Sequence, residues 1–232
     1  AEQTGRVLTM EDCQNNNISD LTVENGYVFS NQSNWNNNQG GGIYAQNSTM
    51  TINNVMIKGN TAGDPQSVPG VYWDVGGGIF IQFSYIILTN SIITENFAMA
   101  GGGIYIYGAN TIVKNVTIIN NSTPSYGGGI AFRGREYGDG VSEYLINTTI
   151  SNNSAVVGGG IYIHDTDINV NFVNSIIWDN IPESIDLTIS GTPIISYSDI
   201  DGGWDGEGNI DADPQFIDPE NDDYTLQEGS PC

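Results

Sequence analysis

Acidic side chains gather in one stretch near the end of the 232-residue chain, and carboxylate oxygens are the ligands that calcium prefers. Glycine turns separate the acids, which follow the spacing D-x-D-x-x-x-D-x-E. An EF-hand loop differs, because it needs Gly at its sixth position and Glu at its twelfth. We therefore expect either a calcium site or a solvated acidic turn, formed by Asp199, Asp201, Asp205 and Glu207. No other cofactor is indicated.

Few other side chains could catalyse a reaction on a polysaccharide. Glycoside hydrolysis needs two carboxylates at a defined separation, and uronate elimination needs a base with a neutralising cation. Glu95 and Asp179 occupy equivalent repeat positions but stand alone, and Lys58 and Lys114 are not aligned. We therefore predict that the protein is not an enzyme, with a polysaccharide lyase or hydrolase as the least favoured alternative.

These groups are carried by a repeated framework. The phrase Gly-Gly-Gly-Ile recurs with starts at 40, 76, 101, 127 and 158, and a phrase ending in Asn follows each copy. A period near 25 residues with insertions is typical of stacked repeats. Short runs rich in β-branched residues predict strands, and the Gly and Asn clusters between them predict tight bends. The sequence therefore predicts an all-β fold, a single parallel β-helix solenoid of about seven coils.

Stacking of the coils predicts columns of equivalent residues. The Ile after each glycine run should form one inward column, namely Ile43, Ile79, Ile104, Ile130 and Ile161. The Asn that closes the second phrase should form a structural ladder that bonds coil to coil. Its predicted members are Asn25, Asn60, Asn96, Asn121, Asn153 and Asn180. Residues 1–198 are then the coils, and residues 199–232 an acidic closing segment of the same domain, in which PQFID and YTLQ pair as strands that close the end.

Two insertions, Gly26–Gln39 and Thr61–Val75, fall at the same corner of adjacent coils. Neighbouring loops with exposed aromatic residues can form a contact surface, although they can equally cover each other and the coil edge. This surface supports an alternative function as an adhesin or carbohydrate-binding module, with glycans as partners. The candidate contact residues are Tyr27, Trp35, Tyr72 and Trp73.

The glycine phrase, the NxTIxxN phrase and the ending DADPQFIDPENDDYTLQEGSPC together resemble bacterial right-handed parallel β-helix repeat proteins. Among these, the chain looks like the secreted group with choice-of-anchor and polymorphic-outer-membrane-protein-like repeats. The resemblance covers nearly the whole chain and implies a right-handed solenoid in a surface or secreted protein. Some relatives of the wider fold are polysaccharide lyases or hydrolases.

The chain has two cysteines, Cys13 in the first coil and Cys232 at the last position. In an extended solenoid about 30 Å would separate them, whereas a disulfide needs Cα atoms within about 7 Å. A bridge from Cys232 of one copy to Cys13 of the next has no such difficulty, and two free thiols are the alternative. Because both solenoid ends expose backbone, head-to-tail contact would generate an open filament. We therefore expect a structural subunit of an extracellular filament or surface assembly that associates mainly with itself.

The formal charge of −22 arises from 27 acidic residues against five Lys and Arg. Such a chain repels nucleic acid and anionic membrane surfaces, so neither is an expected partner. No apolar run approaches the length of a membrane span. The chain shows no signal peptide and begins at Ala1 without Met, as a processed protein would, so we expect an extracellular or cell-surface location.

Overall fold

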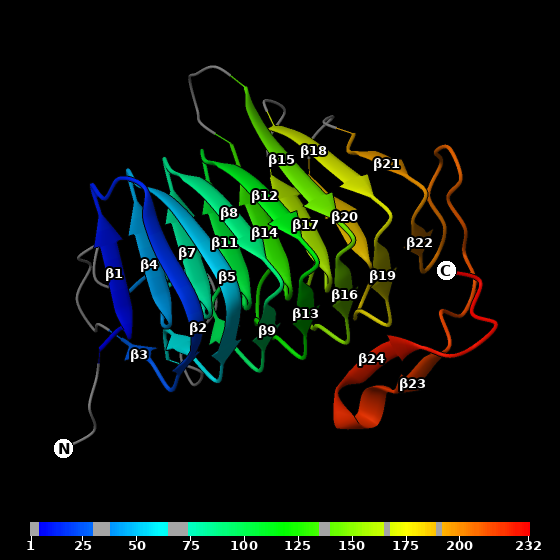
Figure 1. Cartoon of the computed structure of the whole chain (residues 1–232), viewed down its shortest axis with the longest axis horizontal. Coiled ribbons are helices and arrows are strands. Elements are labelled where there is room, and N and C mark those ends of the chain that lie inside the picture. The colour runs from blue at the N-terminus through cyan, green and yellow to red at the C-terminus, as the bar shows by residue number, and fades with distance from the viewer. Residues whose placement is uncertain (1–4, 30–37, 65–73, 135–139, 165–167, 189–191) are drawn as a thin grey trace.

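A computed structural model describes residues 5–29, 38–64, 74–134, 140–164, 168–188 and 192–232. The regular structure of the described chain is almost all β-strand, and its one short helix is the 3₁₀ helix η1 (Pro219–Asn221). The strands form large parallel sheets in which equivalent strands of successive repeats lie side by side (Figure 1). The all-β prediction is therefore confirmed, and the parallel sheets fit a β-helix-like fold.

One sheet contains the strand that follows each glycine run. In order across the sheet, its strands are β1 (Leu8–Glu11), β4 (Ile43–Gln46), β7 (Ile79–Gln82), β11 (Ile104–Tyr107), β14 (Ile130–Arg133), β17 (Ile161–His164) and β20 (Ile185–Leu187). The predicted column Ile43, Ile79, Ile104, Ile130 and Ile161 is in register and fully buried. The repeated Ile therefore specifies both the register and the inward face of this sheet.

A second, larger sheet contains two rows of strands joined by a bend. The first row is β2 (Asn16–Glu24), β5 (Thr49–Lys58), β8 (Tyr85–Thr89), β12 (Asn110–Lys114), β15 (Val141–Ile146), β18 (Ile168–Val173) and β21 (Ile194–Ser196). The second row is β9 (Ile92–Thr94), β13 (Thr117–Ile119), β16 (Thr149–Ser151), β19 (Ile176–Trp178) and β22 (Asp199–Ile200), and the long strands β2 and β5 extend into it. Apolar side chains from both large sheets form one continuous core.

Short strands lie at the corner that receives the insertions. They are β3 (Tyr27–Val28), β6 (Thr61–Ala62) and β10 (Phe97–Ala98), which pair in parallel. Tight corners elsewhere use the left-handed region. Asn54, Asn90 and Asn115 have φ of 54, 50 and 54°, which Asn tolerates better than most residues. Asn therefore bends the chain at the same place in five successive repeats, and Asp20 and Tyr197 take the equivalent position before and after them.

The last segment forms a hairpin but does not close the end of the coils as predicted. Strands β23 (Phe216–Asp218) and β24 (Asp223–Leu226) pair antiparallel, and η1 connects them. The hairpin runs back along the side of the coils (Figure 1), where Asp222 accepts a 2.7 Å hydrogen bond from Asn120. Trp204 packs on the core at the last coil instead. The indole can cover apolar surface there, whereas the hairpin packs its own aromatic rings, Phe216 and Tyr224, against each other.

One core position carries a carboxylic acid. Glu143 alternates with Val141 and Leu145 along β15, so its side chain points inward, and it is 1% exposed. Its Oε2 accepts hydrogen bonds from the backbone N–H and the hydroxyl of Thr111, the first at 2.9 Å. Burial raises the pKa of Glu143 to about 8, although the bonds from Thr111 oppose the shift. The folded protein therefore holds this acid protonated at neutral pH.

Candidate binding surfaces

The predicted asparagine ladder is present in five of its six proposed positions. These side chains are at most 4% exposed. From Asn96 onward, each Oδ1 accepts the backbone N–H and the side-chain amide of the equivalent Asn in the preceding coil, at 2.9–3.1 Å. The ladder therefore satisfies buried backbone at one corner. Its members are Asn60, Asn96, Asn121, Asn153 and Asn180.

Asn25 is not part of this ladder. The register pairs Glu24 with Lys58, which sets Asn25 beside Gly59 in the left-handed turn, with φ of 59°. The backbone N–H of Gly26 donates to Asn60 Oδ1 at 2.9 Å and so takes the place assigned to Asn25. In the first repeat, the residue equivalent to the ladder Asn is therefore Gly26, one residue after the predicted Asn25.

A second amide ladder, which the sequence interpretation missed, is exposed to solvent. Asn115 donates to Asn90 at 3.1 Å, Asn147 to Asn115 at 3.1 Å, and Asn174 to Asn147 at 2.8 Å. The signal was the Asn that opens each second phrase. Because these amides are already bonded to each other, they stabilise the corner and leave little capacity for a ligand.

The four acids proposed for calcium do not converge. Asp199 is buried, and its carboxylate accepts bonds from Ala212 N and Cys232 Sγ at 3.1 and 3.0 Å. Glu207 accepts the hydroxyl of Tyr197 at 2.5 Å. Asp201 and Asp205 line different cavities. Among the described residues, no three His, Cys, Asp or Glu side chains are grouped so that they could hold a metal ion.

The two cysteines lie in the first and last coils. The backbone N–H of Cys13 donates to Ser48 Oγ at 3.1 Å, and its thiol contacts Glu11 O at 3.3 Å. Cys232 lies against Asp199 of β22. Both thiols are free. Desolvation, together with the hydrogen bond to Asp199, raises the pKa of the Cys232 thiol to about 12.

We expect Cys232 to react slowly, because the thiolate is the reacting species and its fraction falls tenfold for each unit by which the pKa rises. With a disulfide reagent near pH 8, Cys232 should label at least about tenfold more slowly in the folded protein than in urea. Asp199→Asn should accelerate the reaction severalfold, since it removes the negative charge. Cys232→Ser identifies the contribution of Cys13. Equal rates for Cys232 in folded and unfolded protein would contradict the assignment.

The proposed aromatic contact surface falls largely outside the described residues. This applies to Trp35, Tyr72 and Trp73. Tyr27 is half-buried in β3 and pairs with Thr61. A buried aromatic stack lies on the outward side of the first sheet, with ring centroids 5.4 Å apart for Tyr44 and Phe80 and 5.9 Å for Phe80 and Tyr105. These rings are at most 2% exposed, so they stabilise the fold and cannot serve as contact residues.

The candidate catalytic acids remain apart. Glu95 and Asp179 occupy the same turn position with φ of 56 and 54°, three coils from each other, which is about 14 Å at ordinary strand spacing. Glu95 forms an ion pair with Lys58 at 2.9 Å. A retaining glycosidase needs two carboxyl groups about 5 Å apart, so this pair does not provide the required geometry.

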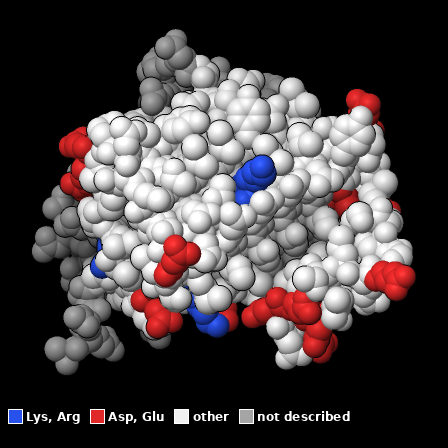
Figure 2. All heavy atoms as spheres, in the orientation of Figure 1, with Lys and Arg blue, Asp and Glu red and all other residues white. Residues whose placement is uncertain are grey.

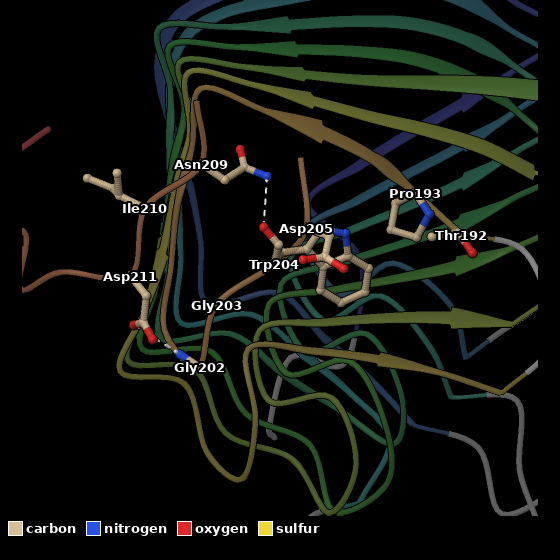
Figure 3. Close-up of a pocket in the computed structure, with 9 residues that line it drawn as sticks. All are labelled: Thr192, Pro193, Gly202, Gly203, Trp204, Asp205, Asn209, Ile210 and Asp211. Carbon is tan, nitrogen blue, oxygen red and sulfur yellow. Dashed lines mark hydrogen bonds between the residues drawn. The ribbon is translucent and has the colours of Figure 1, made fainter. Parts of the chain in front are cut away.

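A cavity of about 690 Å³ lies at the end of the last coil (Figure 3). Trp204 and Asp205 lie on one side of it, with Thr192 and Pro193 facing them from the segment before β21. Asn209 donates to the carbonyl oxygens of Trp204 and Ile195 at 3.2 and 3.0 Å, which ties this segment to the coil. Trp204 also packs on the core, so it covers apolar side chains at this end of the sheets.

The outward positions of β5, β8, β12, β15, β18 and β21 form a flat surface, here called the outer face. Its side chains stand in three columns set by the strand register. These are Thr49, Tyr85, Asn110, Ser142 and Asn169; Thr51, Ile87, Ile112, Tyr144, Asn171 and Ile194; and Asn53, Thr89, Lys114, Ile146, Val173 and Ser196.

The outer face has no carboxylate, although the chain carries 27 acidic residues. The one acid on these six strands is Glu143, which points inward. Figure 2 shows a broad uncharged area over these strands, with a basic side chain within it and acidic side chains toward its borders. Tyr85 and Tyr144 are each 43% exposed and Ile194 is 66% exposed. A face of a parallel sheet is usually covered, so this exposed face is a candidate contact surface.

Comparison with known proteins gives partial similarities. Residues 147–164 match the family described as the Chlamydia polymorphic membrane protein repeat, which supports the resemblance to this type of repeat. Over 166 residues, the chain is 28% identical to the protein named metabotropic glutamate receptor-like protein R of Dictyostelium discoideum. That alignment covers 70% of this chain and 9% of the relative, so the chain corresponds to a small part of a much longer protein. No solved structure matches. Within the described residues, no helix has the length and apolar character needed to cross a membrane.

Proposed function

We propose that the chain is a non-catalytic interaction module of a surface-exposed protein, built as one right-handed solenoid of about seven coils. The observation that carries this proposal is the outer face, which lacks carboxylates in a chain of net charge −22. Solvent exposure alone favours charged side chains on such a surface, particularly in an acidic protein. A face that lacks acids, carries Lys114 as its one charged residue and exposes Tyr and Ile is better suited to contact with a partner.

The location at a cell surface is supported by the repeat match, because the description of the matched family names a membrane protein. The receptor-like name of the Dictyostelium relative is compatible with the same location. The separation of Glu95 from Asp179 favours binding over catalysis, because these two acids stand three coils apart and do not form the carboxylate pair that glycoside hydrolysis needs.

A charge placed on the outer face tests this function without knowledge of the partner. We expect Ile112→Glu to reduce retention of the purified protein on envelope material from its source organism by at least about tenfold, because the charge must be desolvated on contact. Val156→Glu is the matched control, since Val156 is 65% exposed and lies outside the outer face. Circular dichroism checks that both variants fold. Equal retention of the two variants would count against the outer face as the docking surface.

A second candidate is the filament subunit predicted from the sequence. It is favoured by the first coil, where β1 and β2 each pair on one side within the described residues. Such edges accept further strands. A head-to-tail contact would have to displace or accommodate Trp204 at the other end, and the raised pKa of the Cys232 thiol would slow formation of the predicted Cys13–Cys232 bridge. Electron microscopy and non-reducing electrophoresis test this candidate, and a monomer in both would eliminate it.

A further inference from the structure

We propose that the partner of the outer face is a neutral polysaccharide, bound across the strands with Tyr85 and Tyr144 as its stacking platforms. This inference rests on the proposed docking role of the outer face and assigns its ligand class. Three features carry it: the absence of acidic groups from the face, the placement of its two exposed tyrosines, and the amide and hydroxyl groups beside them.

Charge distinguishes among the possible partners. Polyanions are repelled by a protein of net charge −22, and so is a second copy of the chain. A basic protein would be attracted to the carboxylates that surround the face rather than to the face itself. A neutral chain of sugars experiences neither effect. The face itself carries no acid and one exposed cation, Lys114, so its local charge is small and favours a neutral ligand over a strongly charged one.

The positions of the tyrosines suit an extended ligand. Tyr85 is on β8 and Tyr144 on β15, with β12 between them, so the two residues are about 10 Å apart across the sheet. Tyr144 pairs with Ile112 and hence with Ile87, which displaces it from Tyr85 by two residues, or about 7 Å, along the strands. One extended oligosaccharide can therefore reach both rings, with sugars between them. Each ring can cover the C–H face of a sugar while its hydroxyl stays in water.

Polar groups beside the tyrosines can bond the sugar hydroxyls. Asn110 lies next to Tyr85 in the register, and Asn171 lies next to Tyr144. Asn110 is exposed, and its Oδ1 accepts the N–H of Ser142 at 3.0 Å. That bond orients the Asn110 amide and leaves its N–H groups as donors for a ligand. Aromatic and amide groups in one plane match the alternating apolar faces and hydroxyl edges of a sugar chain.

Titration calorimetry with cellohexaose, mannohexaose and xylohexaose tests the assignment, with hexagalacturonate as the acidic comparison. We expect at least one neutral hexasaccharide to bind, with little dependence on salt, and the uronate not to bind. The variant with both Tyr85→Ala and Tyr144→Ala should bind at least about tenfold more weakly. Tyr85→Phe with Tyr144→Phe should retain most of the affinity, because the rings remain. Val156→Ala controls for loss of exposed apolar surface elsewhere.

The alternatives give different results. No binding of any neutral hexasaccharide would overturn the ligand assignment, and the docking role would still stand if Ile112→Glu abolished retention on the envelope. Preferential binding of the uronate, lost in Lys114→Gln, would identify an acidic ligand and overturn the proposal. Sedimentation showing that the tyrosine variant dissociates a dimer would identify a second copy as the occupant.

Discussion

Replacing Glu143 by Gln is expected to stabilise the folded protein near pH 8 and to have little effect near pH 5. The folded-state pKa of Glu143 is about 8, above the ordinary value of 4.5. Between these values the folded chain binds more protons than the unfolded chain, so the stability contributed by this group falls as pH rises. The shift corresponds to at most about 5 kcal/mol in the free energy of unfolding. Gln keeps the acceptor for Thr111 and removes the ionisation.

Urea and thermal denaturation of wild type and Glu143→Gln at about pH 5 and about pH 8 measure this effect. For a chain of this size, several kcal/mol correspond to a rise in Tm of about 10 °C near pH 8. General charge repulsion also grows with pH in so acidic a protein, but it acts on both proteins and cancels in their difference. The exposed Glu220 provides the control substitution Glu220→Gln. A wild-type-to-variant difference that is the same at both pH values would show that Glu143 does not titrate as proposed.

Replacing Asn121 by Ala is expected to cost about 5 kcal/mol in the free energy of unfolding, because it leaves several buried polar groups without hydrogen-bond partners. Asn121 is fully buried, and its amide donates to Ile93 O, Ile119 O and Asn153 Oδ1 at 2.9–3.0 Å. Its Oδ1 accepts the backbone N–H and side-chain amide of Asn96 at 3.0 Å. Alanine replaces none of these bonds, and the site is closed to water.

The exposed ladder supplies a matched control for this prediction. Asn115→Gly removes an amide that bonds Asn90 and Asn147 at 3.1 Å in solvent, at a φ of 54° that glycine adopts easily. This variant should lose no more than about 1 kcal/mol. Urea denaturation monitored by circular dichroism compares the two. If both variants lost the same stability, burial of the ladder would not be the source of its contribution.

The sequence was informative wherever a residue recurs in every coil. The Ile column after the glycine runs is paired in register and buried as predicted. The Asn ladder is likewise formed, because a small amide can bond both along and across the coils. Asn25 was misassigned because the first coil repeats the phrase imperfectly. The residue that contacts the ladder there is Gly26, which has no side-chain amide by which the sequence could identify it.

Features that occur once were harder to predict. Glu143 breaks an apolar column, and only its alternation with Val141 and Leu145 indicates that it points inward. The outer face is defined by the absence of acidic residues from the outward positions of six separate strands. This absence can be recognised only when the order and register of the strands are known. The four C-terminal acids are close in sequence, yet the turn directs Asp199 inward and leaves Asp205 at the cavity, so sequence spacing overestimated their proximity.

Because each coil contacts only its immediate neighbours, the molecule can change its length during evolution by whole coils. Asn96 and Asn121 are bonded equivalents 25 residues apart, so deletion of residues 97–121 would join Asn96 directly to Ser122. Ile79 would then meet Ile130, and every inward column would continue without a gap. Because repeat stability is roughly a sum over adjacent units, whole coils can be gained or lost as single genetic events. Such events would shorten or extend the outer face by one strand.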